Sequence, residues 1–375
     1  MNNSNQSING QPLQFDIEPW QKPVNGEELV NDLAASLRSF VVMRTEEAYA
    51  IAFWIIHTYF IRPPNCPQVF DFSPILNISS PERQCGKSTL RELIYELVPR
   101  PLNAMNASES ALFRKISSSL PTLLIDEADT FLRNRSELTG ILNSGYKQDG
   151  NILRQGGKNY EETIEFSTWS PKCIAGIGRL LDTLGSRCLT IRLKRKKTSE
   201  AVDRRNKVLL NDPNYFTDYK RKILRFSQDN ESAIIALTPE MPMELDDRTQ
   251  DNWHGIFKVA TFISEAALEK AKTSAKLLAS LKYDDQSISI ELLRDIQLIV
   301  NRINQARYTS SFLVDELKKD PDRPWATYNR GGLSPNNLSS LLREFDIYPK
   351  QGKEGAHNLR GYDKEMFRET FDRYL

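Results

Sequence analysis

The chain has 375 residues, of which 39% are hydrophobic and 26% charged, values typical of a globular protein with two or three domains. It has 50 lysines and arginines against 49 acidic residues, so its net charge of +1 says nothing about a polyanionic partner, and any DNA site must come from local basic clusters. Four scattered cysteines without a CxxC pair and three histidines argue against a disulfide framework or zinc site and fit a reducing cytoplasm.

The first 70 residues predict a tail followed by helices. Residues 1–25 begin with a polar stretch that lacks the basic-then-apolar pattern of a signal peptide, and we interpret them as a flexible tail. Residues 26–70 hold two successive helical patterns and form a helical N-terminal segment. The most apolar stretch, Ala48–Ile61, is too short to span a bilayer and predicts a buried helix, so we expect no membrane contact and a cytoplasmic location.

Residues 71–198 alternate between short apolar runs and helical patterns. The predicted strands cover residues 74–80, 122–126, 172–178 and 188–194. A helix beginning near Lys87 follows the first strand, and residues 151–166 alternate on both sides of Gly156-Gly157, the pattern of a β-hairpin. Strands that alternate with helices predict an α/β fold with a parallel-sheet core.

A phosphate-binding loop is predicted where the first strand leads into the Lys87 helix. The segment reads Pro81-Glu82-Arg83-Gln84-Cys85-Gly86-Lys87-Ser88. Backbone N–H groups at a helix start attract phosphates, and Gly86 allows their close approach. Lys87 would reach the β- and γ-phosphates, Ser88 would place its hydroxyl on Mg²⁺, and Thr89 would extend the cradle. Pro81 stands where such loops have their first glycine, so the loop must curve differently, and an ordinary strand–helix turn is the alternative.

The run Leu123-Leu124-Ile125-Asp126-Glu127 is a buried-strand pattern that ends in two acids. Asp126 suits the coordination shell of Mg²⁺, and Glu127 suits the base that polarises an attacking water molecule. A strand that merely emerges into solvent would also end in acids. Because this run and the loop occur together and in this order, we predict an ATP and Mg²⁺ site with ATP hydrolase activity.

Arg187 stands just before the last predicted core strand, in the segment Leu184-Gly185-Ser186-Arg187-Cys188. Arginine keeps its charge, and its planar group suits a γ-phosphate. We therefore predict that Arg187 acts as a catalytic arginine finger in the site of a neighbouring subunit. Arg179 is a weaker candidate for the same role, and a solvated arginine is the alternative.

Two basic features of the same region bear on DNA contact. Arg154 and Lys158 flank the turn of the predicted hairpin and would grip phosphates regardless of base sequence. Charges that only keep a surface hairpin soluble explain them as well. The dense basic run from Arg192 to Lys197 is interpreted instead as the solvated end of a strand.

Residues 199–289 predict a charged, helical lid. Arg248 lies in the segment Asp246-Asp247-Arg248-Thr249-Gln250-Asp251-Asn252-Trp253 and would sense the γ-phosphate as a cofactor-binding residue. An ion pair with Asp247 or Asp251 explains Arg248 as well. Trp253 is assigned to the core.

Residues 290–375 predict a winged-helix domain. Ser334 would cap a helix with an apolar stripe, and the glycine-containing stretch beyond that helix would form the wing. Such a helix enters the major groove while the wing contacts the DNA backbone, although winged helices also bind proteins and nearby acids weaken the DNA interpretation. The candidate DNA-binding residues here are Asn337, Arg343, Lys350, Lys353 and Arg360.

These motifs resemble the AAA+ branch of the P-loop ATPases, in which a Ser-Arg-Cys box like Ser186-Arg187-Cys188 supplies an arginine to a neighbouring subunit. The chain more closely resembles the domain-of-unknown-function 3631 family, found in primase/helicase proteins of phages and mobile elements. The matching segments run over nearly the whole chain after residue 17 and include SPERQCGKSTLRELIYELVPRP, LLIDEADTF and FSTWSPKCIAGIGRLLDTLGSRCLTIRLKRK. AAA+ proteins usually end the strand at Cys173–Gly178 in a polar sensor residue; this chain does not, so none is assigned.

The resemblance implies an ATP-dependent DNA helicase or translocase of a phage or mobile element. It implies a ring, with a hexamer the expected size, that acts on single-stranded or forked DNA alongside replication proteins. Two alternatives stay open. One is an ATP-switched replication initiator or loader that unwinds nothing, and the other is a DNA-binding or defence scaffold whose ATP site hardly hydrolyses.

Overall fold

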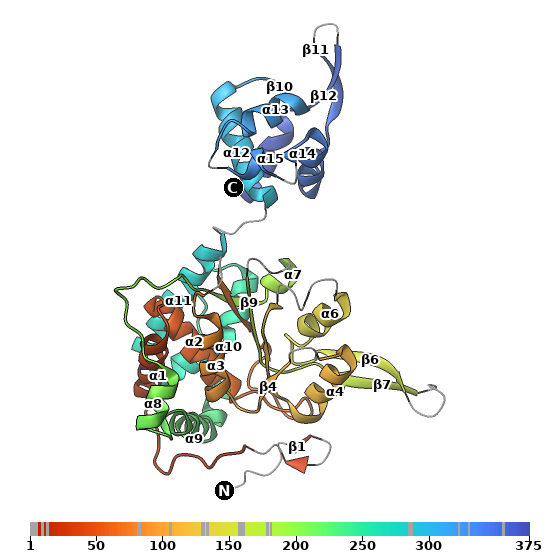
Figure 1. Cartoon of the computed structure of the whole chain (residues 1–375). Helices are drawn as coiled ribbons and strands as arrows, with labels where there is room; N and C mark the ends of the chain where they lie inside the picture. The colour runs from red at the N-terminus through yellow and green to blue at the C-terminus, as the bar shows by residue number, and fades with distance from the viewer. Residues whose placement is uncertain are drawn as a thin grey trace. The chain divides into compact units, whose positions relative to one another are not determined.

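The chain divides into two compact units, Met1–Ser280 and Leu281–Leu375, in a computed structural model of the protein (Figure 1). The structure describes residues 7–8, 11–12, 15–80, 84–104, 107–128, 132, 135–156, 162–177, 180, 182–283, 288–321, 323–328, 331–354 and 357–375. The predicted segments 26–70 and 71–198, together with most of 199–289, lie within the first unit rather than in units of their own.

A five-stranded parallel sheet forms the centre of unit 1, as the alternation of strands and helices predicted. In spatial order its strands are β4 (Pro101–Asn103), β5 (Thr122–Ile125), β8 (Lys172–Ile177), β3 (Ile75–Ser80) and β9 (Cys188–Arg192). The register pairs Ile75 with Cys188 and Ser79 with Arg192, so β3 and β9 begin and end together. β8 lies between β3 and β5, an insertion that the order along the chain does not reveal.

Helices cover both faces of this sheet because its strands are apolar on both sides. Along β3, for example, Leu76 packs into one cluster of buried residues while Ile75 packs into the other. The cluster on the first face includes side chains from α1 (Gly26–Phe40), α2 (Thr45–Thr58), α3 (Lys87–Leu97), α9 (Tyr215–Ala236), α10 (Asp247–Ile263) and α11 (Glu265–Tyr283), and α8 (Arg205–Asn211) packs against it. The second face is covered by α4 (Glu109–Ser119), α6 (Ser136–Ser144) and α7 (Asp182–Gly185).

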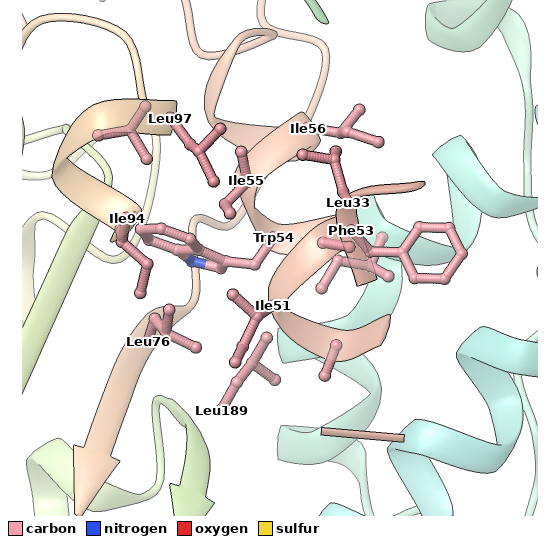
Figure 2. Close-up of a cluster of buried hydrophobic side chains, with 14 of the residues drawn as sticks. Leu33, Ile51, Phe53, Trp54, Ile55, Ile56, Leu76, Ile94, Leu97 and Leu189 are labelled. Atoms are coloured by element: carbon pink, nitrogen blue, oxygen red, sulfur yellow. The ribbon is translucent and has the colours of Figure 1, made fainter. Parts of the chain in front are cut away.

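The apolar stretch in α2 is the centre of the first cluster, which confirms the predicted buried helix. Figure 2 shows Trp54 of α2 near Leu76 of β3 and Ile94 of α3, with Leu33 of α1 on another side of α2. The indole Nε1 of Trp54 donates a hydrogen bond to the carbonyl of Pro74, at 2.8 Å. None of the helices in the described residues combines the length and the apolar composition needed to cross a membrane.

The predicted β-hairpin is present as β6 (Asn151–Gly156) and β7 (Glu162–Ser167), which pair antiparallel. In Figure 1 this hairpin extends away from the sheet beside α4 and α6. Residues 157–161, at the turn, lie outside the described residues.

The prediction of a flexible tail over residues 1–25 is wrong for residues 15–25, which pack against the first unit. After the short strands β1 (Ser7–Ile8) and β2 (Gln11–Pro12), the ring of Phe15 stacks on Tyr59 with ring centroids 6.1 Å apart. The backbone N–H of Trp20 donates to the carbonyl of Arg221, at 2.9 Å. Aromatic side chains in a polar segment therefore attach residues 15–25 to helices α2 and α9.

Unit 2 surrounds a three-stranded antiparallel sheet with the strand order β10-β12-β11. Its elements are α12 (Ile288–Ile303), β10 (Arg307–Thr309), α13 (Ser310–Leu317), the 3₁₀ helix Pro324–Ala326, α14 (Pro335–Leu342), the 3₁₀ helix Arg343–Phe345, β11 (Lys350–Glu354), β12 (His357–Asp363) and α15 (Glu365–Tyr374). The predicted cap of α14 is confirmed, since the Ser334 hydroxyl accepts the N–H of Asn337 at 3.2 Å.

A polar contact fixes the core of unit 2. The indole of the buried Trp325 donates to Asp295 at 2.7 Å, and Arg323 pairs with the same carboxylate at 3.0 Å. Burial raises the pKa of Asp295 above its ordinary value, while the indole and Arg323 act in the opposite direction. These contacts join α12 to the segment before α14, so unit 2 has a core of its own.

Candidate functional site

A pocket of about 710 Å³ lies where the carboxyl ends of four core strands meet. Residues that follow β3, β5 and β9, and Gly176 near the end of β8, line it. Parallel α/β sheets bind their ligands at this edge, where the chain leaves neighbouring strands in opposite directions. The geometry therefore marks this pocket as the candidate site of unit 1.

The turn from β3 into α3 forms one wall of the pocket. Gly86 is the N-cap of α3 at φ +87°, a left-handed conformation that favours glycine, and a Cβ there would lie 3.2 Å from a methyl group of Val41. Lys87 begins α3, and its Nζ donates to the hydroxyl of Ser80 at the end of β3. The predicted residues Gly86, Lys87, Ser88 and Thr89 all line the pocket. Pro81 lies outside the described residues.

The two predicted acids line the same pocket. Asp126 follows β5, and its Oδ1 accepts the backbone N–H of Glu127 at 2.9 Å. Glu127 is exposed and has φ +50°, a conformation that costs a residue with a side chain about 1 kcal/mol or more. Backbone strain of this kind is concentrated at functional sites, where the surrounding structure holds it in place.

Arg91, which the sequence analysis did not single out, holds the second oxygen of Asp126. Its Nε lies 3.1 Å from Oδ2 of Asp126, and its Nη1 donates to Oδ1 of Asn103 at 2.7 Å. The guanidinium group therefore fixes the carboxylate from behind, between α3 and the end of β4. Arg91 follows Lys87 by four residues, a spacing in the sequence that places both side chains on one face of α3.

The basic run after β9 is exposed, as its interpretation as a solvated strand end predicted, and two of its lysines also line the pocket. Lys194 and Lys196 reach it because the chain leaves β9 at the same edge where β3 and β5 end. Arg195 between them donates to the amide oxygen of Gln84 at 2.6 Å and so joins this run to the β3–α3 loop. The missed signal was the position of the run: a basic segment directly after a parallel core strand lies at the ligand edge.

The remaining wall of the pocket is apolar. It consists of Phe40–Val42, at the end of α1, and Val202. The N–H of Asp203 donates to the carbonyl of Ser39 at 2.7 Å, so the segment after the basic run turns back onto α1. The pocket thus has a cationic side, an acidic side and an apolar side.

The structure does not bring Arg187 or Arg248 to this pocket. Ile75, the first residue of β3, donates its N–H to the carbonyl of Arg187 at 3.0 Å, so Arg187 lies at the amino edge of the sheet. Arg248 lies beside it, because both guanidinium groups are over the ring of Tyr146. A γ-phosphate sensor in its own pocket is therefore the wrong interpretation of Arg248, and its Nη1 instead lies 3.7 Å from Asp251, the predicted alternative. Arg179 lies outside the described residues.

The DNA candidates of the hairpin are only partly described. Arg154 forms an ion pair with Glu137 of α6, and its guanidinium carbon lies 5.2 Å from the ring centroid of Phe113 in α4. Its side chain is therefore directed to the base of the hairpin and not to the tip. Lys158 lies outside the described residues.

In unit 2 the DNA candidates differ in accessibility. The amide oxygen of Asn337 accepts from the hydroxyl of Ser334 at 2.6 Å, so Asn337 belongs to the helix cap and is half-buried. Arg343, Lys350 and Arg360 are exposed. Lys353 lies in β11, and its side chain lies outside the described part of the chain.

The comparisons with known proteins concern different parts of the chain. Residues 192–374 match the model of a family described as "Protein of unknown function (DUF3631)", so the earlier segments quoted for that resemblance lie outside the match. A protein of Saccharopolyspora erythraea, named "Uncharacterized 28.9 kDa protein in xis 5'region", is 28% identical over 166 residues. These residues are 44% of this chain and 62% of that protein, so the chain spans less than two thirds of its relative.

Among solved structures, the fold is similar to one described as "The A form apo structure of NrS-1 C terminal region-CTR". The TM-score is 0.44 at 10% sequence identity, and the aligned part covers 93% of this chain and 77% of that chain.

Proposed function

We propose that the pocket binds ATP with Mg²⁺ and hydrolyses ATP, and that the chain assembles into a ring that uses this hydrolysis to move along or unwind DNA. The observation that carries the proposal is that Lys87, Asp126 and Glu127 line one pocket of about 710 Å³ at the carboxyl edge of a parallel sheet. A lysine at a helix start and two acids after another strand of the same sheet are the groups that a metal–triphosphate requires.

The residues present suit Mg²⁺, a hard cation that prefers oxygen ligands and keeps several waters. The Ser88 hydroxyl and the Asp126 carboxylate would hold the metal, which would neutralise charge on the phosphates. Arg91 would keep Asp126 oriented through its contact at 3.1 Å. Glu127, exposed at the pocket, would orient and deprotonate the attacking water.

The other two walls fit the rest of the nucleotide. Lys194 and Lys196 would offset the charge of the triphosphate, in addition to Lys87 and the N–H groups at the start of α3. Phe40–Val42 and Val202 provide apolar contact for the base. Arg187, at the opposite edge of the sheet, would serve the pocket of a neighbouring subunit, as an arginine finger does.

The strand order supports an AAA+-like P-loop ATPase, with the loop strand β3 inside the sheet and β8 between it and the acid-bearing β5. The element order of unit 2, with the helices α12, α13 and α14 before the β11–β12 hairpin and the strand order β10-β12-β11, supports a C-terminal winged helix. Exposed Arg343, Lys350 and Arg360 of unit 2 are its candidates for phosphate contacts with DNA.

The test is the Lys87→Ala variant of the full chain. We expect it to lose ATP binding, measured with a fluorescent ATP analogue, and to lose DNA-stimulated phosphate release. Lys276→Ala is the matched control, because that lysine is exposed and pairs with Glu244 on the surface. Undiminished nucleotide binding by Lys87→Ala would refute the proposed site.

A DNA-binding or defence scaffold whose ATP site hardly hydrolyses is the second candidate, favoured by the residue that β8 presents to the pocket. That residue is Gly176, which offers no side chain to orient a water molecule. Phosphate release separates the two functions, because such a scaffold would bind ATP and release hardly any phosphate.

A further inference from the structure

Tyr146 is a platform for two arginines that come from separate elements. The guanidinium carbon of Arg187, before β9, lies 5.7 Å from the centroid of the Tyr146 ring, and that of Arg248, in the first turn of α10, lies 5.6 Å from it. Tyr146 is 1% exposed, and its carbonyl accepts the N–H of Ser73 at 2.9 Å. Cation–π contact therefore holds both arginines on a fixed support.

A hydrogen bond fixes the two arginines relative to each other. Asn252, one helical turn after Arg248, is 2% exposed and donates its amide N–H to the carbonyl of Ser186 at 3.0 Å. Ser186 immediately precedes Arg187. The start of α10 and the segment before β9 thus behave as one support for both guanidinium groups.

The charges of this cluster are incompletely balanced by its surroundings. Two guanidinium groups on one ring repel each other. Arg248 has Asp251 at 3.7 Å, and Arg187 donates to the neutral carbonyl of Thr183. The Nε of Arg187 is buried and has no hydrogen-bond partner among the described residues. Such a pair suits an anion that accepts several hydrogen bonds, as a phosphate group does.

The cluster cannot reach the pocket of its own chain. It lies at the start of β3, whereas the pocket lies beyond Ser80 at the end of that strand. Five residue steps along a strand span about 17 Å, which one side chain does not bridge. The pocket and the cluster therefore lie at opposite edges of the same sheet, the arrangement that head-to-tail association of identical units requires.

We propose that Arg248 acts with Arg187 as a two-arginine site for the terminal phosphate of ATP held in the pocket of a second copy of this chain. The inference rests on the proposed ATP site, and it changes the role of Arg248 from a sensor in its own pocket to a partner of the arginine finger. The second copy is favoured over other anions because its pocket is lined by Asp126 and Glu127 and would hold the triphosphate at the edge that would meet the cluster in a head-to-tail ring.

The test mixes two inactive variants of the full chain. Arg248→Ala keeps an intact pocket, and Lys87→Ala keeps intact arginines. Alone, Arg248→Ala should lose about 10²–10³-fold in ATP turnover, as happens when a donor to a developing charge is removed. It should bind a fluorescent ATP analogue as the parent chain does. Mixed in equal amounts, the two variants should recover up to about a quarter of parental activity. An active interface needs the intact pocket of Arg248→Ala and the intact Arg248 of Lys87→Ala, and random assembly places the two variants in this order at about a quarter of the interfaces.

Two further variants make the result independent of folding. Arg248→Lys keeps the charge but loses the planar fork, so its turnover should fall by less than that of Arg248→Ala. Arg225→Ala is the matched control: this arginine of α9 pairs with Asp229 at 2.7 Å and contacts neither site, so its turnover should equal that of the parent. Thermal unfolding of each variant confirms that the fold persists.

Several outcomes overturn the inference while the ATP site stands. These are full turnover by Arg248→Ala, or no recovery on mixing with Lys87→Ala. Unchanged DNA-free turnover together with weaker binding of a single-stranded oligonucleotide would assign the cluster to DNA. If Lys87→Ala alone binds ATP normally, the proposed ATP site is wrong. This binding is measured before the variants are mixed.

Discussion

The two edges of the parallel sheet in unit 1 are built in different ways. At the carboxyl edge the chain leaves the strands in exposed loops, with Gly86 and Glu127 at positive φ around a pocket of about 710 Å³. At the amino edge the polar groups are buried. Lys172 is 1% exposed there, and its Nζ donates to the carbonyls of Gly145 at 2.8 Å, Ser170 at 2.8 Å and Thr168 at 3.3 Å.

The difference indicates that the carboxyl edge serves activity and that the amino edge stabilises the fold. Groups at the carboxyl edge are accessible and partly strained, so their substitution should change activity more than stability. Groups at the amino edge are buried and hydrogen-bonded, so their substitution should change stability more than activity. Arg187 and Arg248 are the exceptions at the amino edge: buried neighbours fix them, and their proposed role is in the pocket of a second copy of the chain.

The sharpest test of the carboxyl edge is Glu127→Gln. The amide has the shape of the carboxylate but cannot accept a proton, so ATP hydrolysis should fall by about 10³-fold. The side chain is exposed, so the free energy of unfolding should stay within about 0.5 kcal/mol of that of the parent. Phosphate release, nucleotide binding and denaturant unfolding measure the three quantities. A fully active variant would remove Glu127 from the reaction.

For the amino edge the corresponding variant is Lys172→Met. Burial lowers the pKa of Lys172 to about 7, so the substitution removes little buried charge at neutral pH. It leaves three buried carbonyls without the Nζ donor, and we expect a loss of about 2 kcal/mol in the free energy of unfolding. Urea titration at neutral pH measures it, and exposed Lys276→Met is the control. Equal stability of Lys172→Met and the parent would contradict the supporting role of this edge.

The smallest expected effect is a pH dependence from His57, which stacks on Phe70 with ring centroids 4.3 Å apart, beside the segment that leads into β3. Burial lowers the pKa of His57 from 6.5 to about 3. Between these values the unfolded chain binds a proton that the folded chain does not, so stability should fall as the pH drops below 6.5, by up to about 1.4 kcal/mol per pH unit. His57→Leu should reduce this slope, measured by urea titrations between pH 5 and 7. An unchanged slope would show that other groups cause it.

The sequence by itself determined the local features on which the site depends. The residues at the start of the Lys87 helix, the strand that ends in Asp126 and Glu127, and the buried helix at Ala48–Ile61 were recognisable because each is encoded by a short run of neighbours. The hairpin and the Ser334 cap were predictable for the same reason. Such patterns depend on hydrophobic periodicity and turn chemistry, which act over a few residues.

Only the tertiary structure decided which of these features meet. β8 lies between β3 and β5, Lys194 and Lys196 line the pocket, and Arg248 lies with Arg187 at the far edge of the sheet. Periodicity shows that a residue lies on a buried or an exposed face, but it does not show which edge of a sheet a distant helix reaches. That choice comes from packing between segments far apart in the chain, where many weak contacts act together.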